Sequence, residues 1–255
     1  MSRQYKFFKG SLNPAHILDV SRYRSAFRSE HPEYFDPDGI LVFCGAQGQG
    51  KTISAVSYVL NLCRAYPQVV VCSNVGLNDR EDLLFVKVDD AESGAVQRWL
   101  GERETGKIVV PYIPYDDVSR LDSVKNGYAG VIFLIDEMHL EFNSLESKEL
   151  DSSIFYTVSQ QRKQRKHIVG TSQVFTRLAK PFREQFKYVV NCKCLFNVFQ
   201  INTLVNAEEA KEVDGKLEAS PIKTFFWFHT SDLYESYDTL QLIKRTRAAW
   251  KGGKR

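Results

Sequence analysis

The chain has 255 residues, of which 43% are apolar and 25% charged, and its 34 Lys and Arg against 31 Asp and Glu leave a net charge of +3. This composition excludes a disordered chain, a collagen-like repeat and a disulfide scaffold, and the small net charge excludes a histone-like binder. Five cysteines without CxxC or Cys/His spacing predict reduced thiols and no zinc site. We find no secretory signal and no run of about 18 apolar residues, so we expect a soluble chain without a transmembrane helix.

The first 38 residues are polar and aromatic, and they predict an irregular arm or lid with one short helix over 17–28. From residue 39, short apolar runs alternate with helical stretches. This pattern is typical of an α/β fold in which a mostly parallel sheet is flanked by helices. The predicted strands are 40–44, 69–72, 83–88, 131–135, 167–170 and 188–190, and the predicted helices are 51–65, 91–100 and about 152–165.

The remaining segments connect or extend this sheet. Residues 101–130 are rich in Gly, Asp, Tyr and Pro and predict a loop or small insertion. The strand-like, aromatic stretch after Lys193 predicts a hairpin or edge strands. We expect its aromatic run, 225–228, to fill both faces of a buried strand, whereas exposure of that run would favour an interaction surface. The predicted organisation is an arm or lid (1–38), an α/β core (39–195), a C-terminal β-rich extension of the core (196–243) and a basic tail (244–255).

A phosphate-binding motif follows the first predicted strand. GAQGQGKT matches GxxxxGK[ST] without a mismatch, between an apolar run and a helix-compatible stretch. Glycines let backbone N–H groups surround a phosphate, Lys51 reaches the outer phosphates, and Thr52 places its hydroxyl on Mg²⁺. The core is therefore predicted to be a P-loop ATPase, although the motif does not separate ATP from GTP. We predict that ATP binds at Gly45, Ala46, Gln47, Gly48, Gln49, Gly50, Lys51, Thr52 and Ile53.

Two carboxylates, Asp136 and Glu137, come directly after the apolar run 131–135. Ligands in open α/β sheets bind beyond the carboxyl ends of the strands, so we predict that Asp136 holds Mg²⁺ from the side opposite Thr52. Glu137 is predicted to polarise the attacking water, which separates a hydrolysing motor from a P-loop kinase. The alternative is an ordinary strand whose acids favour the start of a helix.

A basic segment, SQQRKQRKH, leads into the apolar run HIVG and then into the polar TSQ. Gln173, beyond the end of that strand, is predicted to sense the γ-phosphate. Arg162 and Arg165 are predicted to act on a neighbouring subunit's nucleotide or on a nucleic-acid backbone, with Arg177 and Arg183 as rival arginine fingers. The alternatives are a solvated helix end for the arginines and a hydrogen-bonded turn for Gln173.

These motifs, together with VVVCSNVGL and PIKTFFWFHTSDLYESYDT, resemble the zonular occludens toxin-like ATPases of filamentous phages, part of the wider FtsK/HerA group of DNA-pumping ATPases. The resemblance spans residues 39–239. It implies a RecA-like core with an extra strand between the phosphate-loop strand and the acidic strand, assembly into a ring, and translocation or extrusion of DNA. It also implies that the family's nucleotide roles fall on Lys51, Thr52, Asp136, Glu137 and Gln173.

Three functions stay open at this point. The filamentous-phage assembly proteins carry a transmembrane helix and a periplasmic portion that this sequence lacks, so we expect a viral or mobile-element packaging ATPase rather than an extrusion channel. A nucleotide-gated assembly module with slow hydrolysis and a P-loop kinase are the alternatives. The expected partners are further copies of this chain, DNA, and a viral capsid or membrane assembly partner. The expected location is the cytoplasm of the host cell, with any attachment to a virion or membrane made through partners.

Overall fold

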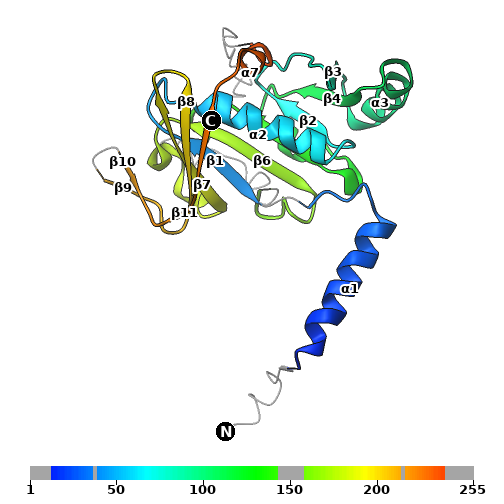
Figure 1. Cartoon of the computed structure of the whole chain (residues 1–255), viewed down its shortest axis with the longest axis horizontal. Coiled ribbons are helices and arrows are strands. Elements are labelled where there is room, and N and C mark those ends of the chain that lie inside the picture. Colours follow the sequence, from blue (N-terminus) through cyan, green and yellow to red (C-terminus); the bar gives the residue numbers. More distant parts are fainter. Residues whose placement is uncertain (1–12, 37–38, 143–157, 214–215, 239–255) are drawn as a thin grey trace, which may run out of the picture. The chain divides into compact units, whose positions relative to one another are not determined.

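One large sheet positions the other elements of the fold. The computed structural model describes residues 13–36, 39–142, 158–213 and 216–238. Within these ranges the sheet has nine strands in the order β11-β8-β7-β1-β6-β5-β2-β4-β3, and Figure 1 shows it flanked by helices. Strands β7 to β3 in this order all pair in parallel, whereas β8 and β11 are antiparallel. The predicted α/β class with a mostly parallel sheet is therefore confirmed.

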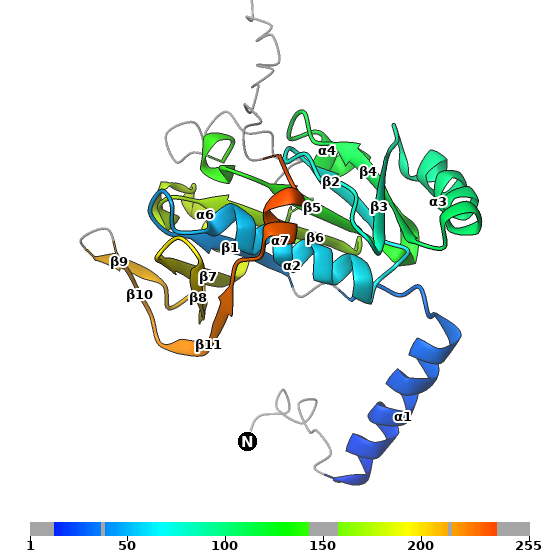
Figure 2. The ribbon, with the colours of Figure 1, turned by 45° about the horizontal axis from the view of Figure 1, so that its top comes forward.

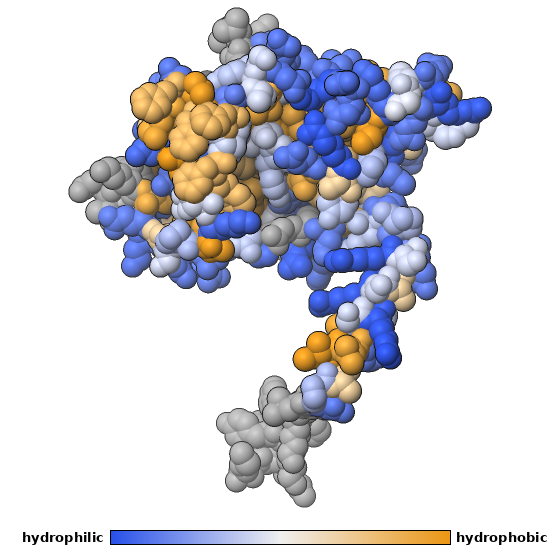
Figure 3. All heavy atoms as spheres, in the orientation of Figure 1, coloured by the Kyte–Doolittle hydropathy of each residue, from blue (hydrophilic) through white to orange (hydrophobic). Residues whose placement is uncertain are grey.

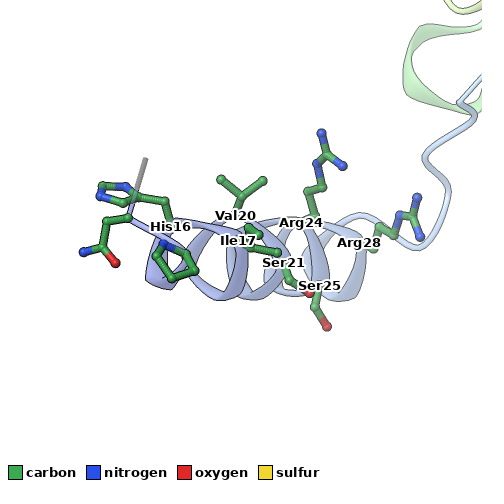
Figure 4. A pocket seen from close by; sticks show the side chains of 9 residues that line it. His16, Ile17, Val20, Ser21, Arg24, Ser25 and Arg28 are labelled. Carbon is green, nitrogen blue, oxygen red and sulfur yellow. The ribbon is translucent and has the colours of Figure 1, made fainter. Parts of the chain in front are cut away.

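The chain divides into two units, Met1–Tyr34 and Phe35–Arg255. In the described part of the first unit, helix α1 spans Ala15–Glu30 and buries none of its residues. Figure 4 shows side chains along this helix, among them Ile17, Val20 and Arg24. Because the residues shown belong to α1 and its start, they form an open helix face rather than an enclosed cavity. The predicted role of this segment as an arm or lid stays a prediction.

The central strands of the second unit are buried along their whole length. They are β1 (Ile40–Cys44), β2 (Val70–Ser73), β5 (Val131–Ile135) and β6 (Lys166–Ser172). Alternate residues of β1 belong to two different apolar clusters, because successive side chains of a strand point to opposite faces. The sheet is therefore the middle layer between two cores, which explains why its strands are continuous apolar runs.

Helix α2 (Lys51–Ala65), as predicted, begins at the end of the phosphate-binding motif and packs on the central strands. At the far edge, β3 (Leu83–Lys87) is followed by α3 (Ala91–Thr105). No helix in the described ranges is long and apolar enough to cross a bilayer. The shorter helical segments are α4 (Arg120–Ser123), η2 (Gly127–Ala129), η3 (Met138–Leu140), η4 (Phe175–Arg177), α6 (Lys180–Arg183) and α7 (Ser231–Glu235).

Strand β6 lies between β1 and β5 and forms hydrogen bonds with both. In this register Cys44 is beside Ser172, and Ile135 is beside Gly170. This is the extra strand between the phosphate-loop strand and the acidic strand that the resemblance implied, so that expectation is confirmed. The polar residues that follow β6 consequently lie between the two motifs.

The C-terminal part of the chain widens the sheet, as predicted. Strand β7 (Phe186–Leu195) pairs in parallel with β1, β8 (Phe199–Asn206) pairs antiparallel with β7, and β11 (Pro221–Phe228) pairs antiparallel with β8. The charged break between β8 and β11 contains a separate two-stranded sheet of β9 (Lys211–Val213) and β10 (Lys216–Glu218).

The prediction that residues 101–130 form a loop or insertion is wrong. Helix α3 continues to Thr105, and β4 (Ile108–Pro114) lies inside the sheet between β2 and β3. Its two prolines argued against a strand, because proline donates no ladder hydrogen bond. Pro111 instead packs under α3, where a Cβ on Gly94 would lie 2.6 Å from the Pro111 Cβ.

The helix predicted over 152–165 also needs correction. Residues 152–157 lie outside the described residues, and the helical conformation ends at 159 rather than at 165. The segment before β6 is a turn, and Arg165 adopts a left-handed φ of 54° that is incompatible with a helix. The segment is too polar to give a helix an apolar face that could hold it against the core.

The aromatic run of β11 is not the buried core strand that we expected. Phe226 is 63% exposed and Phe228 is 66% exposed. Strand β11 is the edge of the sheet and is hydrogen-bonded to β8 alone in the described chain. Its side chains therefore have a neighbouring strand on one side only, which leaves them more exposed than those of a central strand. Figure 3 shows hydrophobic side chains gathered over this end of the sheet. Phe199 of β8 stacks with Phe226 of β11, with ring centroids 6.2 Å apart.

A buried lysine at the start of β6 links the stability of the fold to pH. Lys166 is 1% exposed, and its Nζ donates to the carbonyl oxygen of Leu121 at 2.6 Å and of Asp122 at 3.3 Å. Burial lowers the pKa of Lys166 to about 8. The unfolded chain keeps this proton up to about pH 10.4, so between the two values it binds more protons than the folded chain and the free energy of unfolding rises with pH.

We therefore expect the stability of the wild-type protein, relative to Lys166→Met, to increase by about 1–3 kcal/mol between roughly pH 7 and pH 10. Urea unfolding of both proteins across this range measures the difference. The comparison cancels the opposite effect of buried thiols such as Cys63, whose pKa burial raises to about 12. Parallel pH curves for the two proteins would contradict this account of Lys166.

Candidate nucleotide-binding site

The site lies where three neighbouring parallel strands end. The phosphate-binding motif follows the carboxyl end of β1, the two carboxylates follow β5, and the polar residues 171–173 come at the end of β6. Because β1, β6 and β5 are adjacent and parallel, their carboxyl ends meet at one edge of the sheet. This edge is where open α/β sheets bind ligands.

The phosphate loop, residues 45–52, is held in a conformation that needs glycine. Gly48 and Gly50 have φ values of 76° and 72°, in the left-handed region. Gly50 forms the N-cap of α2, so the backbone N–H groups at the start of this helix face the loop. Lys51 is buried, and its Nζ donates to the Ala46 carbonyl oxygen at 3.1 Å. The lysine thus curls over its own loop.

Asp136 is the point at which the two motifs meet. Its Oδ1 accepts a hydrogen bond from Thr52 Oγ1 at 2.9 Å and another from Thr171 Oγ1 at 2.6 Å. Carboxylate and hydroxyl oxygens are ligands that suit Mg²⁺, which is usually bound by one or two protein groups together with phosphate and water oxygens. The donors at Thr52 and Asp136 therefore fit Mg²⁺.

Asn74, which follows β2, fixes the backbone beneath this carboxylate. Its Nδ2 donates to the Asp136 carbonyl oxygen at 3.0 Å, and its Oδ1 accepts from the Asp136 N–H at 2.8 Å. An amide side chain that pairs in both directions with the backbone of one residue holds that backbone in place, while Thr52 and Thr171 hold the Asp136 carboxylate.

Glu137 is positioned by the same cluster but its carboxylate has a different neighbour. The residue has a left-handed φ of 51°, and its N–H donates to Thr171 Oγ1 at 2.9 Å. Its Oε2 lies 3.2 Å from His139 Nδ1, and the side chain is 26% exposed. To act on water at a γ-phosphate, Glu137 would have to exchange this neighbour for the water. Its role in activating water stays a prediction.

Gln173 and the arginines differ in their relation to this edge. Gln173 is half-buried and directly follows the carboxyl end of β6, so it lies at the correct edge for a phosphate sensor. Arg162 and Arg165 precede β6 and lie at the opposite end of the strand, where Arg165 Nη1 is 3.6 Å from Asp36 Oδ1. The structure therefore does not bring them to the phosphate loop of their own chain. Arg177, by contrast, is exposed in η4, after the carboxyl end of β6.

The C-terminal extension braces the phosphate loop. The Gln49 Oε1 accepts from the Cys194 N–H at 3.0 Å, and the Gln49 carbonyl oxygen accepts from Gln200 Nε2 at 3.1 Å. A Cβ on Gly45 would lie 2.7 Å from the Cys192 carbonyl oxygen, so β7 approaches the loop closely. The loop is thus supported by strands that come about 150 residues later in the chain.

Sequence reasoning did not assign Thr171 or Gln200 to the site. Thr171 was part of the polar segment noted after HIVG, but nothing in the sequence shows that its hydroxyl shares an oxygen of Asp136 with Thr52. Gln200 is one of several polar residues in the β8 sequence FQINTLVN, so the sequence does not single it out. Its complete burial, at 0% exposure, is the signal of a role, and this becomes visible only in the fold.

No protein-family model matches the sequence, and no curated protein matches it. Among solved structures, the chain is similar to the N-terminal domain of zonular occludens toxin from Neisseria meningitidis, with 15% identity, a TM-score of 0.48, and coverage of 78% of this chain and 98% of that chain. The protein group that the sequence resembles is therefore among the similar structures.

Two further solved structures are similar. The genome packaging NTPase B204 of Sulfolobus turreted icosahedral virus 2, in complex with ATP-gammaS, has 12% identity, a TM-score of 0.46, and coverage of 73% of this chain and 99% of that chain. The flagellar accessory protein FlaH from Methanocaldococcus jannaschii has 9% identity, a TM-score of 0.41, and coverage of 68% of this chain and 80% of that chain. At these identities the likeness carries no activity over to this chain.

Two glycines of the loop provide a matched test of its packing. Both have left-handed φ values, but a methyl group on Gly50 would overlap Gln200 Oε1, whereas one on Gly48 would meet nothing within 4 Å. We expect Gly48→Ala to lower the free energy of unfolding by about 1–2 kcal/mol, the cost of a left-handed backbone. Gly50→Ala should cost clearly more. Urea denaturation measures both, and equal losses would contradict the close contact with Gln200.

Proposed function

We propose that this protein is a Mg²⁺-dependent ATPase that assembles into a ring and translocates or packages DNA. The single observation that best supports hydrolysis is the hydrogen bond between Thr52 and Asp136 beside the phosphate loop. These residues are 84 positions apart in the sequence, yet Thr52 Oγ1 lies 2.9 Å from Asp136 Oδ1. A carboxylate and a hydroxyl that can hold Mg²⁺, beside a loop whose backbone suits phosphates, support this proposal. A bound Mg²⁺ would neutralise charge on the phosphate oxygens.

Each residue of the site has a defined task in this proposal. Backbone N–H groups of the phosphate loop hold the phosphates, and Lys51 exchanges the Ala46 carbonyl for a phosphate oxygen. Thr52 and Asp136 hold Mg²⁺. Glu137 orients and deprotonates the attacking water, and Gln173, beyond the adjacent strand, responds to the γ-phosphate.

The positions of the arginines favour contact with DNA or with a neighbouring copy's nucleotide over contact with the nucleotide of their own chain. Arg162 is exposed before the amino end of β6, so it can reach a DNA backbone or a neighbouring copy. Arg177 lies after the same strand's other end and is the better placed of these arginines to approach a nucleotide at an interface between copies. A DNA-moving ring, which contacts its substrate through few basic side chains per copy, is compatible with a net charge of only +3.

A specific observation also favours a second candidate, a nucleotide-gated assembly module with slow hydrolysis. The exposed aromatic side chains of Phe196, Phe226 and Phe228 form the kind of apolar surface that marks protein contacts. Phe228 directly precedes His229, which lines a pocket at the phosphate loop. A change at the nucleotide could therefore reach this surface. The kinase alternative has no comparable observation in its favour.

Two substitutions separate binding from hydrolysis. Lys51→Ala should weaken Mg²⁺-ATP binding by about 10- to 100-fold, because a charged hydrogen bond to phosphate is lost. Glu137→Gln should leave binding within about threefold and lower turnover by about 100-fold or more, because the general base is lost. Calorimetric titration and phosphate release measure the two effects. Full turnover by Glu137→Gln would exclude Glu137 as the base, and a phosphorylated acceptor in place of free phosphate would indicate a kinase.

DNA dependence separates the motor from the assembly module. We expect double- or single-stranded DNA to raise the rate of phosphate release at least about tenfold in a ring-sized species, because a translocating motor couples hydrolysis to its substrate. Phosphate release with each DNA form, alongside light scattering, measures this. Slow hydrolysis that DNA does not change, in a preparation confirmed as oligomeric, would favour the assembly module.

A further inference from the structure

A pocket of about 330 Å³ adjoins the phosphate loop on the side of the C-terminal extension. One wall is made by the loop and the first residues of α2. The other wall comes entirely from the last third of the chain, from Cys194, Asn197, His229, Tyr234 and Tyr237. None of these five residues belongs to a phosphate-binding motif, so the pocket extends beyond the part of the site that holds phosphates.

Three residues of this second wall, His229, Tyr234 and Tyr237, lie on a strap, residues 229–238, above α2. Figures 1 and 2 show α7 lying over α2, between β11 and the β2–β3 side of the sheet. The strap is held to the β2–β3 loop, where the Asn78 N–H donates to the Ser236 carbonyl oxygen at 2.9 Å and Arg80 pairs with Asp232. Tyr237, which pairs with Leu77, is buried, and burial raises its pKa to about 12.

A buried amide connects the strap to the phosphate loop. Gln200 Nε2 lies 3.1 Å from the Gln49 carbonyl oxygen, which can only accept, so the nitrogen faces the loop. The same nitrogen donates to Asn202 Oδ1 at 2.8 Å. Gln200 Oε1, the other atom of this amide, lies 3.0 Å from His229 Nε2 and acts as an acceptor there.

The wall has one hydrogen-bond donor too few. His229 Nδ1 lies 2.6 Å from the Tyr234 hydroxyl, which also lies 3.0 Å from the Asn197 carbonyl oxygen. A neutral imidazole has one N–H, and a tyrosine has one O–H. Two protons thus face three acceptors, namely Gln200 Oε1, the bare imidazole nitrogen and the Asn197 oxygen.

The lowered pKa of His229 is consistent with this count. Burial lowers the pKa of His229 below its ordinary value, against the smaller opposing effect of a hydrogen bond with the Asn197 backbone, and this favours the neutral imidazole. Only the imidazolium would satisfy every acceptor, by donating from both ring nitrogens. Among the described residues, the wall therefore presents an acceptor that a donor on a ligand can fill.

We propose that this wall recognises the nucleoside part of the nucleotide, with His229 and Tyr234 in contact with the base or ribose. A nucleoside offers the missing donor, as an amino group of the base or a hydroxyl of the ribose, and an apolar face for the two rings. This inference rests on the proposed nucleotide site and adds to it the residues that distinguish a nucleotide from a bare polyphosphate. Gln200 is a positioning residue, because it holds His229 and the phosphate loop together.

The competing explanation is that the network only braces the loop. The two explanations differ in what the wall does for a ligand that has no nucleoside. A brace supports the phosphate loop for every polyphosphate, so its loss would weaken ATP and tripolyphosphate alike. Contact with the nucleoside contributes to ATP binding alone.

The test is calorimetric titration of the full chain with Mg²⁺-ATP and with Mg²⁺-tripolyphosphate. For Tyr234→Ala and His229→Gln we expect ATP affinity to fall about tenfold, the loss of one well-formed contact, and tripolyphosphate affinity to stay within about twofold. Tyr128→Ala, an exposed tyrosine before the opposite end of β5, should change neither. Thermal unfolding of each variant confirms that the fold is retained.

Other results would overturn the inference. Equal losses for ATP and tripolyphosphate would show a brace, and unchanged ATP affinity in both variants would remove His229 and Tyr234 from the site. Wild-type protein that binds tripolyphosphate no better than Lys51→Ala would instead refute the proposed nucleotide site itself. Titration with 2′-deoxyATP, which lacks the 2′-hydroxyl of the ribose, and with inosine triphosphate, which lacks the amino group of the base, then identifies the ligand donor that the wall contacts.

Discussion

The insertion of β6 between β1 and β5 is the constraint on which the candidate site depends. Parallel strands that are hydrogen-bonded in register must end at the same edge, so Cys44, Ser172 and Ile135 deliver their following residues to one place. The spacing lets Thr171 bridge the two motifs, because its hydroxyl meets both the Asp136 carboxylate and the Glu137 N–H. Were β1 and β5 direct neighbours, this threonine would not lie between them.

The conformation of the phosphate loop also depends on contacts with the C-terminal part of the chain. The loop has little support from its own neighbours in sequence, since its glycines lack side chains that pack. Gln200 and the backbone of Cys194 supply that support from β8 and β7. The C-terminal extension consequently borders the candidate nucleotide site, where β7 and β8 contact the phosphate loop and the strap lines the adjoining pocket. This arrangement also joins the site to the exposed aromatic edge of β11, which ends one residue before His229.

Local patterns predicted much of this architecture, and their failures have physical causes. The helix over 51–65 and the strands over 40–44 and 131–135 were found with the predicted bounds, because each is a strongly patterned segment with a clear start or stop. Strand β4 was missed because prolines usually break a strand, and here Pro111 packs beneath a glycine of α3. The prediction that β11 is buried was wrong because the residue pattern of a strand does not show whether the strand lies at the edge of the sheet.

The sequence by itself determined the class of fold and the candidate groups for binding phosphate and metal, since Lys51, Thr52 and Asp136 belong to motifs whose chemistry is local. Only the tertiary structure decided which groups meet. Thr171, Gln200, His229 and Tyr234 come from different strands and from the strap, and their distances depend on strand order and register. Arg162 and Arg165 fall at the opposite edge from the phosphate loop for the same reason. A hydrogen bond acts over about 3 Å, so residues far apart in sequence acquire a shared role only when the sheet brings them within that distance.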